Sequence, residues 1–324
     1  MTKLSVIIPV FRVEKFIRNS AESLLSQSIR EGIEFIFVDD ASPDRSRAIL
    51  EDVISCHPER NGQVKIITHS KNSGLPAARN TGLEAAKGEY IYHFDSDDFA
   101  DATLFECMLS EAEKTDADYL WADWFLSYDH SERTMKQPQT ENIPEAILKM
   151  LSGDLKYNVW NKMVRRSLYI DNNIYFPTGH SMGEDMTMIM LLAHAGKIHY
   201  VNNAWYHYVK TNSNAMTASI SAGALDDILF NVNRTTQHLI ESTDFVSPQA
   251  IAHFKLSSKY PFLFSDRKTD YRIWKSLWPE SNEYISAKRG SKRYIIELMA
   301  KLNFWPGIWL HFKLYKSIYN LLYR

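Results

Sequence analysis

Four short apolar runs, each separated from the next by a segment of helical pattern, constrain the fold of this chain more than any other feature. They read LSVIIPV, IEFIFVDD, VKIITH and YIYHF, and they occupy residues 4–10, 33–40, 64–69 and 90–94. Runs that are apolar at nearly every position and rich in β-branched or aromatic residues are typical of strands buried on both faces of a parallel sheet. Strands alternating with helices at this spacing predict βαβ units and an open α/β sheet.

The segments between these runs predict helices over about residues 14–29, 44–56 and 75–87. In open α/β sheets, ligands bind at the edge formed by the carboxyl ends of the strands. Acidic residues gather at those ends in this chain, because Asp39-Asp40 and Asp95–Asp98 end or directly follow apolar runs. The sequence therefore predicts a ligand site at this edge of the sheet.

The second acidic cluster, Asp95-Ser96-Asp97-Asp98, places three carboxylates within four residues. Such carboxylates repel one another unless a cation or hydrogen-bond donors neutralise them. Oxygen ligands select hard cations, and Mg²⁺ is usually held by one or two carboxylates together with substrate phosphates. An acidic turn before the helix expected near Thr103 would give the same pattern, so the cluster alone leaves both interpretations open.

Several motifs, in this order and at this spacing, resemble those of family 2 glycosyltransferases, which have the GT-A fold. In the first hundred residues they are SVIIPVF at 5–11, VDDASPDRS at 38–46, Asn72-Ser73-Gly74 followed by Ala78-Arg79-Asn80, and DSDD at 95–98. Farther on, three motifs resemble those of the members that build bacterial surface polysaccharides. They are Trp160-Asn161-Lys162, Phe176-Pro177 and Gly183-Glu184-Asp185. The resemblance covers about residues 4–213 and implies a Rossmann-like α/β domain, with a mainly parallel sheet, that binds a nucleotide sugar.

The resemblance implies how the first half of the chain would hold the nucleotide. Members contact the nucleobase through the backbone that follows the first strand, here Pro9, Val10 and Phe11. Asp40 would accept a hydrogen bond from a pyrimidine N–H, and the expected donor is UDP-linked. Its neighbour Asp39 has the alternative role of a turn acid or helix cap.

Around the diphosphate, the resemblance implies contacts from Asn72 and Gly74. A glycine has no side chain, so the backbone there can come close to ribose or phosphate. Arg79 would support the acidic loop and the diphosphate, and the alternative is an ordinary surface arginine on a helix.

For the acidic loop, the resemblance implies that Asp95 faces the ribose and that either Asp97 or Asp98 binds Mn²⁺ or Mg²⁺. His207, in the aromatic run WYHY, is a candidate third ligand as a neutral imidazole. Packing among aromatic side chains is the alternative for His207. Members often have an arginine at the end of this run, but here Val209-Lys210 stands in that place, so the role of that arginine is not carried over.

The transfer reaction also needs a base. Displacement at the anomeric carbon requires the acceptor hydroxyl to lose its proton as it attacks, and a divalent ion neutralises the departing diphosphate. The resemblance implies that Asp185 is this base, that Glu184 is a binding partner, and that the enzyme inverts the anomeric configuration. Both acids also fit the first turn of a helix. Lys162 would hold phosphate or orient the acceptor, and the alternative is a solvated surface lysine.

The predicted organisation is a catalytic domain over residues 1–215 and a helical region over 216–324. The catalytic domain would consist of a nucleotide-binding half, 1–100, and an acceptor-side half, 101–215. The end of the helical region, 288–324, has eight Lys or Arg and one Glu, a net charge of +7, which leaves −9 for the remainder of a chain of net charge −2. This asymmetry excludes nucleic acid as the expected partner of the acidic body and suggests anionic lipid for the tail.

Within that tail, apolar side chains recur at helical spacing, with Trp305 and Trp309 suited to a lipid headgroup boundary. The predicted face consists of Ile308, Phe312, Tyr315, Tyr319 and Leu322. These features predict a helix lying in the plane of the membrane. The alternative is a helix packed on the protein itself, as aromatic stripes usually are.

Two cysteines cannot form a disulfide framework or a zinc cluster, and no apolar run is long enough to span a bilayer. We therefore expect a cytoplasmic protein bound peripherally at the inner face of the membrane. The predicted activity is transfer of a sugar to a saccharide or lipid-linked saccharide acceptor in bacterial surface glycan synthesis. The alternative from a different class is a non-catalytic module that binds nucleotide sugars or glycans.

Overall fold

The computed structural model describes residues 2–128, 130–210, 222–286 and 291–323. The chain divides into two compact units. The first unit comprises Met1–Ile143 and Tyr157–Thr235, and the second comprises Pro144–Lys156 and Thr236–Arg324.

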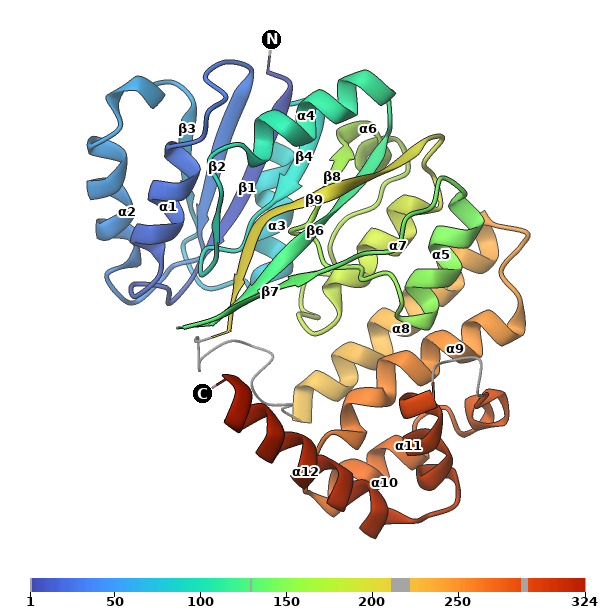
Figure 1. The fold of residues 1–324 in the computed structure, drawn as a ribbon. Helices are drawn as coiled ribbons and strands as arrows, with labels where there is room; N and C mark the ends of the chain where they lie inside the picture. The colour runs from blue at the N-terminus through green and yellow to red at the C-terminus, as the bar shows by residue number, and fades with distance from the viewer. Residues whose placement is uncertain (1, 129, 211–221, 287–290, 324) are drawn as a thin grey trace. The chain divides into compact units, whose positions relative to one another are not determined.

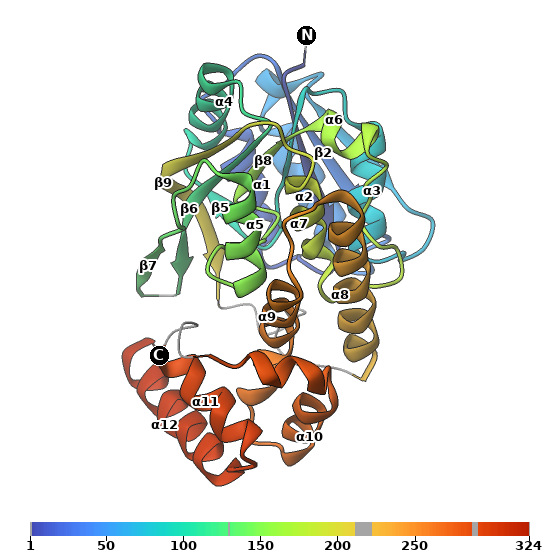
Figure 2. The same cartoon turned by 90° about the vertical axis from the view of Figure 1, so that its right-hand side faces the viewer.

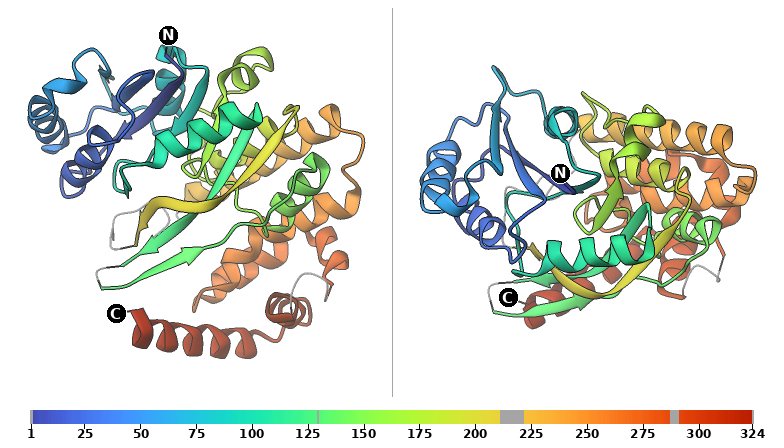
Figure 3. Two further views of the ribbon diagram at one scale, coloured as in Figure 1. Left: turned by 45° about the horizontal axis from the view of Figure 1, so that its top comes forward. Right: turned by 90° about the horizontal axis from the view of Figure 1, so that it is seen from above.

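The first unit is built on one mixed sheet, which Figures 1 and 3 show from several sides. The strand order is β3-β2-β1-β4-β8-β6-β9-β5, with β7 paired to β6. The first four strands are parallel and span Leu4–Val10 (β1), Ile33–Asp39 (β2), Val64–Thr68 (β3) and Tyr90–His93 (β4). The others are Phe99–Ala100 (β5), Tyr119–Ser127 (β6), Glu132–Met135 (β7), Lys162–Arg165 (β8) and Ile198–Val209 (β9). The predicted α/β fold is confirmed, and antiparallel pairing begins where β8 joins β4.

Three helices connect the parallel strands, as predicted, and are slightly shorter than expected: Ile17–Leu25 (α1), Ser46–Ser55 (α2) and Leu75–Ala85 (α3). The start of α3 is set by Gly74, whose φ of 89° is costly for other residues, and by a proline in the first turn. The remaining helices of this unit are Leu104–Thr115 (α4), Arg166–Asp171 (α6), Thr187–Leu192 (α7) and the first part of Ala222–Ser242 (α8).

Every residue of β1 is buried, because helices and neighbouring strands cover it on all sides. Two residues before β4 begins, the chain comes close to β1 at Gly88, whose amide donates a 2.8 Å hydrogen bond to Ser5 Oγ. A Cβ at position 88 would lie 2.5 Å from the backbone nitrogen of Ser5, closer than real Cβ atoms come. The glycine therefore sets the spacing of the two central strands.

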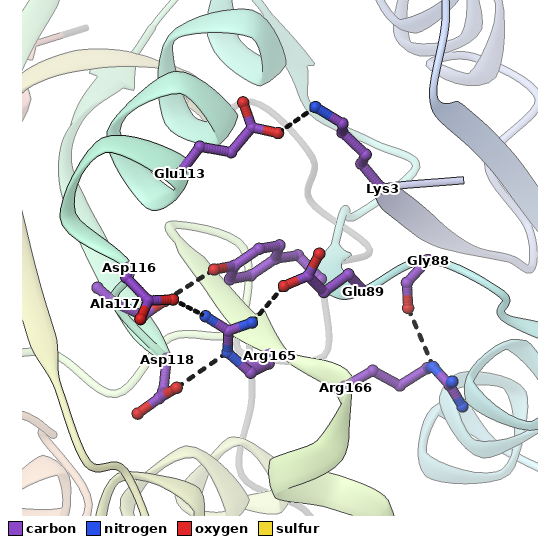
Figure 4. A network of polar contacts seen from close by, with 10 residues as sticks. Lys3, Gly88, Glu89, Glu113, Asp116, Ala117, Asp118, Arg165 and Arg166 are labelled. Atoms are coloured by element: carbon purple, nitrogen blue, oxygen red, sulfur yellow. Dashed lines mark hydrogen bonds and ion pairs between the residues drawn. The ribbon is translucent and has the colours of Figure 1, made fainter. Parts of the chain in front are cut away.

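A network of charges lies at the end of the sheet where β1 and β4 begin (Figure 4). Arg165, on β8, contacts Asp118 at 2.9 Å, Asp116 at 2.8 Å and the carboxylate of Glu89. Its guanidinium also lies 4.9 Å from the centre of the Tyr90 ring. This network ties β4, β8 and the start of β6 together at the edge opposite to the carboxyl ends of the parallel strands.

The second unit is helical, and its C-terminal helices are best seen in Figure 2. Its elements include Ile143–Ser152 (α5), Pro248–Lys259 (α9), Lys268–Ser276 (α10), Ser291–Lys301 (α11) and Trp305–Tyr323 (α12). None of the helices in the described ranges combines the length and the hydropathy needed to cross a bilayer. Lys259 is buried among them, where Nζ donates to the Leu277 carbonyl at 2.7 Å and to Asn282 Oδ1 at 2.8 Å.

The faces of α12 differ from the prediction. Ile308 is fully buried, and the Tyr315 ring lies 5.7 Å from that of Phe264, so this side packs within the unit. Tyr319 and Leu322 lie outside the residues whose side chains are described. Tyr315 is nevertheless 49% exposed. The other exposed large apolar side chains described on α12 lie away from Ile308, at Trp309, Leu310, Leu314 and Ile318.

Candidate active site

The carboxyl ends of β1, β2 and β4 form the site edge. Pro9 and Val10 are buried in β1, and Phe11, directly after it, is exposed. The amide of Asp40 donates to the Val10 carbonyl at 3.0 Å, which holds the end of β2 beside the end of β1. Asp39 Oδ1 accepts from the Ser42 amide at 2.9 Å, so Asp39 is the turn acid that the sequence analysis left as its alternative.

The Asp40 carboxylate is buried and bonded to protein donors. Oδ1 lies 2.7 Å from His69 Nδ1 and accepts from the Ser73 amide at 2.8 Å, while Oδ2 accepts from the Gly74 amide at 2.8 Å. Asp40 thus holds the loop expected to approach ribose or phosphate, in which Asn72 is exposed. Its expected bond to a pyrimidine stays a prediction, and it would use the second lone pair of Oδ2.

Arg79 is not a surface arginine, because only 2% of it is exposed. Its guanidinium donates to Glu184 Oε1 at 2.7 Å and to Asp95 Oδ1 at 3.0 Å. Burial acts to lower the pKa of Arg79, but the charges of Asp95 and Glu184 outweigh it and raise that pKa. One buried cation therefore joins the acidic loop after β4 to the Glu184-Asp185 segment, and Glu184 is 105 residues from Arg79 in sequence.

The two candidate metal ligands differ in their surroundings. Asp98 is buried, and its oxygens accept from the Tyr206 hydroxyl at 2.5 Å and the Val209 amide at 2.7 Å. Burial, and then the charges of Asp97 and Asp95, raise the pKa of Asp98 well above its usual value. Asp97 is partly exposed. These contacts tie the loop to β9 through Asp98, and Asp97 stays a candidate ligand.

His207 has both ring nitrogens beside carboxylates outside the DSDD motif. Nδ1 lies 2.6 Å from Glu132 and Nε2 lies 3.2 Å from Asp101. The ring stacks on Phe99 and Phe125, with centroids 4.3 Å and 4.8 Å away. The packed alternative therefore fits His207 better than a ligand role. Within the ranges that the structure describes, no group of three or more His, Cys, Asp or Glu side chains is arranged to hold a metal ion.

Glu184 and Asp185 form a short 3₁₀ turn, Glu184–Met186 (η2), that leads into α7. Burial raises the pKa of Glu184, against the charge of Arg79. Burial, and then the charge of Glu184, raise the pKa of Asp185 to about 8, against the charges of Arg79 and Lys162. A carboxylate poised near neutral pH is suited to accept a proton.

Lys162 is not a solvated surface lysine, since it is 1% exposed. Its Nζ donates to the Asn158 carbonyl and to Asn161 Oδ1, both at 2.7 Å. Burial lowers its pKa well below the ordinary lysine value, although the charge of Asp185 opposes that shift. Lys162 is therefore a buried neighbour of the expected base, with little surface to offer a phosphate.

Comparison with known proteins adds to this geometry. Residues 5–186 match the profile described as Glycosyl transferase family 2, which is more than half of the chain. The chain belongs to this family.

The enzyme is 31% identical to EpsJ, a glycosyltransferase of Bacillus subtilis, over 235 residues that span 70% of this chain and 66% of EpsJ. It is 26% identical to the glycosyltransferase GlyG of Streptococcus pneumoniae over 239 residues, 70% of this chain and 77% of GlyG. The crystal structure of S. aureus TarS 1–349 in complex with UDP-GlcNAc is similar with a TM-score of 0.68 at 19% identity, covering 98% of this chain and 92% of that chain. This last likeness shows the shared fold.

Two residues of this family 2 glycosyltransferase were missed by the sequence analysis. His69 joins Asp40 to Thr81, with Nε2 2.9 Å from Thr81 Oγ1. Tyr206 holds Asp98 and stacks on Trp160 with ring centroids 4.5 Å apart. Nothing local identifies Asp98 as the partner of Tyr206, because their pairing spans 108 residues.

Proposed function

We propose that the protein transfers a sugar from a UDP-linked donor to an acceptor hydroxyl, with inversion at the anomeric carbon, in bacterial surface glycan synthesis. The family and relatives such as EpsJ and GlyG support this assignment. The observation that carries it is the Arg79 bridge, which joins the acidic loop of the donor side to the Glu184-Asp185 turn. The acceptor class is a saccharide or a lipid-linked saccharide.

In the proposed mechanism, Asp185 accepts the proton of the acceptor hydroxyl while that oxygen attacks the anomeric carbon. The bond from this carbon to the UDP oxygen breaks at the opposite face, so the configuration inverts and UDP leaves. Glu184, held by Arg79, fixes the turn on which Asp185 lies. Proton removal by a positioned carboxylate typically contributes about 10²–10⁴ in rate.

The proposal includes a hard divalent cation, and Asp97 would hold Mn²⁺ or Mg²⁺ together with the donor diphosphate. Few protein carboxylates are needed, because Mg²⁺ commonly takes most of its ligands from phosphate and water. The ion would neutralise charge on the departing diphosphate. Asp95, which Arg79 orients, remains the expected ribose contact.

The decisive experiment first identifies a donor, by measuring which UDP-sugar raises the melting temperature in the presence of Mn²⁺. With that donor and a glycan acceptor, Asp185→Asn should reduce turnover by two to four orders of magnitude and leave donor affinity nearly unchanged. Turnover should also be lost in excess chelator and in Asp97→Asn.

Normal turnover in Asp185→Asn would refute the base assignment. Donor binding without turnover in the wild-type protein, with every acceptor tried, would support the binding-module alternative.

For localisation, we propose peripheral attachment at the inner face of the cytoplasmic membrane. The support is the +7 charge of residues 288–324 together with the exposed Leu310, Leu314 and Ile318 of α12. Truncation before residue 288 would remove the buried Ile308 from the second unit, so point variants are the better test. Changing the three exposed residues to serine should weaken sedimentation with anionic vesicles, and wild-type binding should fall as salt increases. Equal sedimentation of variant and wild type would contradict the proposal.

A further inference from the structure

One face of α8 lies along the segment 175–187, which contains the proposed base. Asp227, Asn231 and Arg234 are spaced i, i+4 and i+7, so they share that face. Each of them hydrogen-bonds to this segment. Asp227 and Asn231 bond within the loop 178–183, which leads to Glu184, and Arg234 bonds on either side of it. All of these contacts lie inside the first unit.

The loop itself is held at two residues. The Asp227 carboxylate accepts from the Met182 amide at 3.1 Å and lies 3.2 Å from His180 Nδ1. The Asn231 amide donates to the carbonyls of the same two residues, at 3.3 Å and 3.1 Å. The His180 ring also stacks on Phe230, with centroids 3.7 Å apart and planes 7° from parallel.

Arg234 extends the contact to both flanks of the loop. Its guanidinium donates to the Tyr175 carbonyl on one side and to Thr187 Oγ1, at 3.1 Å, on the other. The helix therefore fixes the segment where it enters the loop and where it leaves the turn that carries Asp185.

The loop has little packing of its own, since every residue from 178 to 183 is at least partly exposed. It turns at Gly179 and Gly183, both with φ of 88°. It also borders the donor side, because a Cβ at Gly74 would lie 3.5 Å from Ser181 Oγ. A loop with few buried contacts opens easily unless polar bonds hold it, so the bonds from α8 carry this task.

We propose that Asp227 and Asn231 are positioning residues for the transfer reaction, which hold the 178–183 loop against the donor loop and thereby fix Asp185 over the anomeric carbon. The inference rests on the proposed function of Asp185. Displacement of a reacting group by about 1 Å can cost roughly 10²-fold in rate. An opened loop would also admit water to Asp185, whose raised pKa comes first from burial.

The test compares Asn231→Ala with Asn233→Ala, the same substitution at an exposed position two residues along α8. Hydrogen–deuterium exchange of peptides covering 176–187 is measured without ligand. We expect exchange about tenfold faster in Asn231→Ala and unchanged in the control. With the donor identified by thermal stabilisation, kcat should fall by about 10–100-fold in Asn231→Ala. The acid limb of the pH–rate profile of Asn231→Ala should move to lower pH, because water that reaches Asp185 lowers its pKa. The charged groups that face Asp185, which are Glu184, Arg79 and Lys162, are unchanged in this variant.

Wild-type exchange in Asn231→Ala, or faster exchange with kcat and pH profile equal to those of Asn233→Ala, overturns the inference. If Asn231→Ala does not fold, Asp227→Asn tests the same contact at the partly exposed rim. One of the two oxygens that face His180 and Met182 then becomes an amide donor, so one of the two contacts is lost. An inactive Asp185→Asn beside a fully active Asn231→Ala defeats only this inference. An active Asp185→Asn defeats the base assignment on which the inference rests as well.

Discussion

Replacing Arg79 by methionine tests whether one buried cation holds the site together. The substitution keeps most of the volume and removes the charge that lies between Asp95 and Glu184. Glu184 is buried, and Asp95 is about one-quarter exposed at its side chain. Removing one partner of a buried ion pair typically costs about 3–5 kcal/mol, because the remaining charge is left uncompensated. We expect a loss of about 3 kcal/mol in unfolding free energy at pH 8, since water reaches Asp95 and screens part of the effect.

The pH dependence gives this prediction a sign. Without Arg79, the pKa of Glu184, already raised by burial, should rise further. Consider a carboxyl group whose pKa is higher in the folded state than in the unfolded state. It contributes its full stability below the unfolded pKa, and this contribution is lost as pH rises through the folded pKa. The deficit of Arg79→Met should therefore be smaller at pH 5 than at pH 8, with a slope of up to about 1.4 kcal/mol per pH unit for one group.

Urea unfolding at the two pH values, followed by tryptophan fluorescence, measures the deficit. The control is Arg18→Met, which removes an exposed pair with Asp52 and should change the unfolding free energy little. Adding Glu184→Gln to Arg79→Met should recover part of the loss, because the buried group is then neutral. Equal deficits for Arg79→Met and Arg18→Met, or a deficit that shrinks as pH rises, would refute the reasoning.

Other predictions concern single residues. Gly88→Ala should lower the unfolding free energy by about 1–3 kcal/mol in urea melts, because its Cβ meets the backbone of β1, whereas Gly223→Ala, with open space around it, should not. The pH–rate profile should show an acid limb well above the usual aspartate range, near pH 8, and Lys162→Met should move it to higher pH, because Lys162 favours ionised Asp185. Asp98→Asn should lower the melting temperature by several degrees, because Tyr206 and Val209 donate to different oxygens of Asp98 and one of these becomes an amide donor in asparagine.

Local sequence predicted the parallel half of the fold well, because its signals are local. Apolar runs mark strands whatever lies elsewhere in the chain, and Gly74 followed by Pro76 marks the start of α3. The predicted position of the candidate site came from the same pattern, since Asp40 and Asp95 follow apolar runs. The resemblance also led to Arg79, whose bond to the acidic loop is present.

The chemical state of each side chain could not be predicted in this way, because its partners come from distant segments. The sequence left open an exposed position for Lys162 and a metal-ligand role for His207. The structure buries both side chains beside groups that no local pattern identifies. The interpretation of the tail's charge stays a prediction, and its exposed face differs in part from the one expected. α12 is apolar on more than one side, and the periodicity of Ile308, Phe312 and Tyr315 could not tell which side meets the second unit.

The stack of Trp160 on Tyr206 gives the acidic loop an optical reporter. The Tyr206 hydroxyl donates to Asp98, so a change in charge or geometry at the loop reaches the indole through one hydrogen bond and one ring contact. Indole emission responds to nearby charge and to aromatic stacking. A variant in which Trp160 is the sole tryptophan would let donor and cation arrival be followed in stopped-flow mixing, without a label and before any product forms.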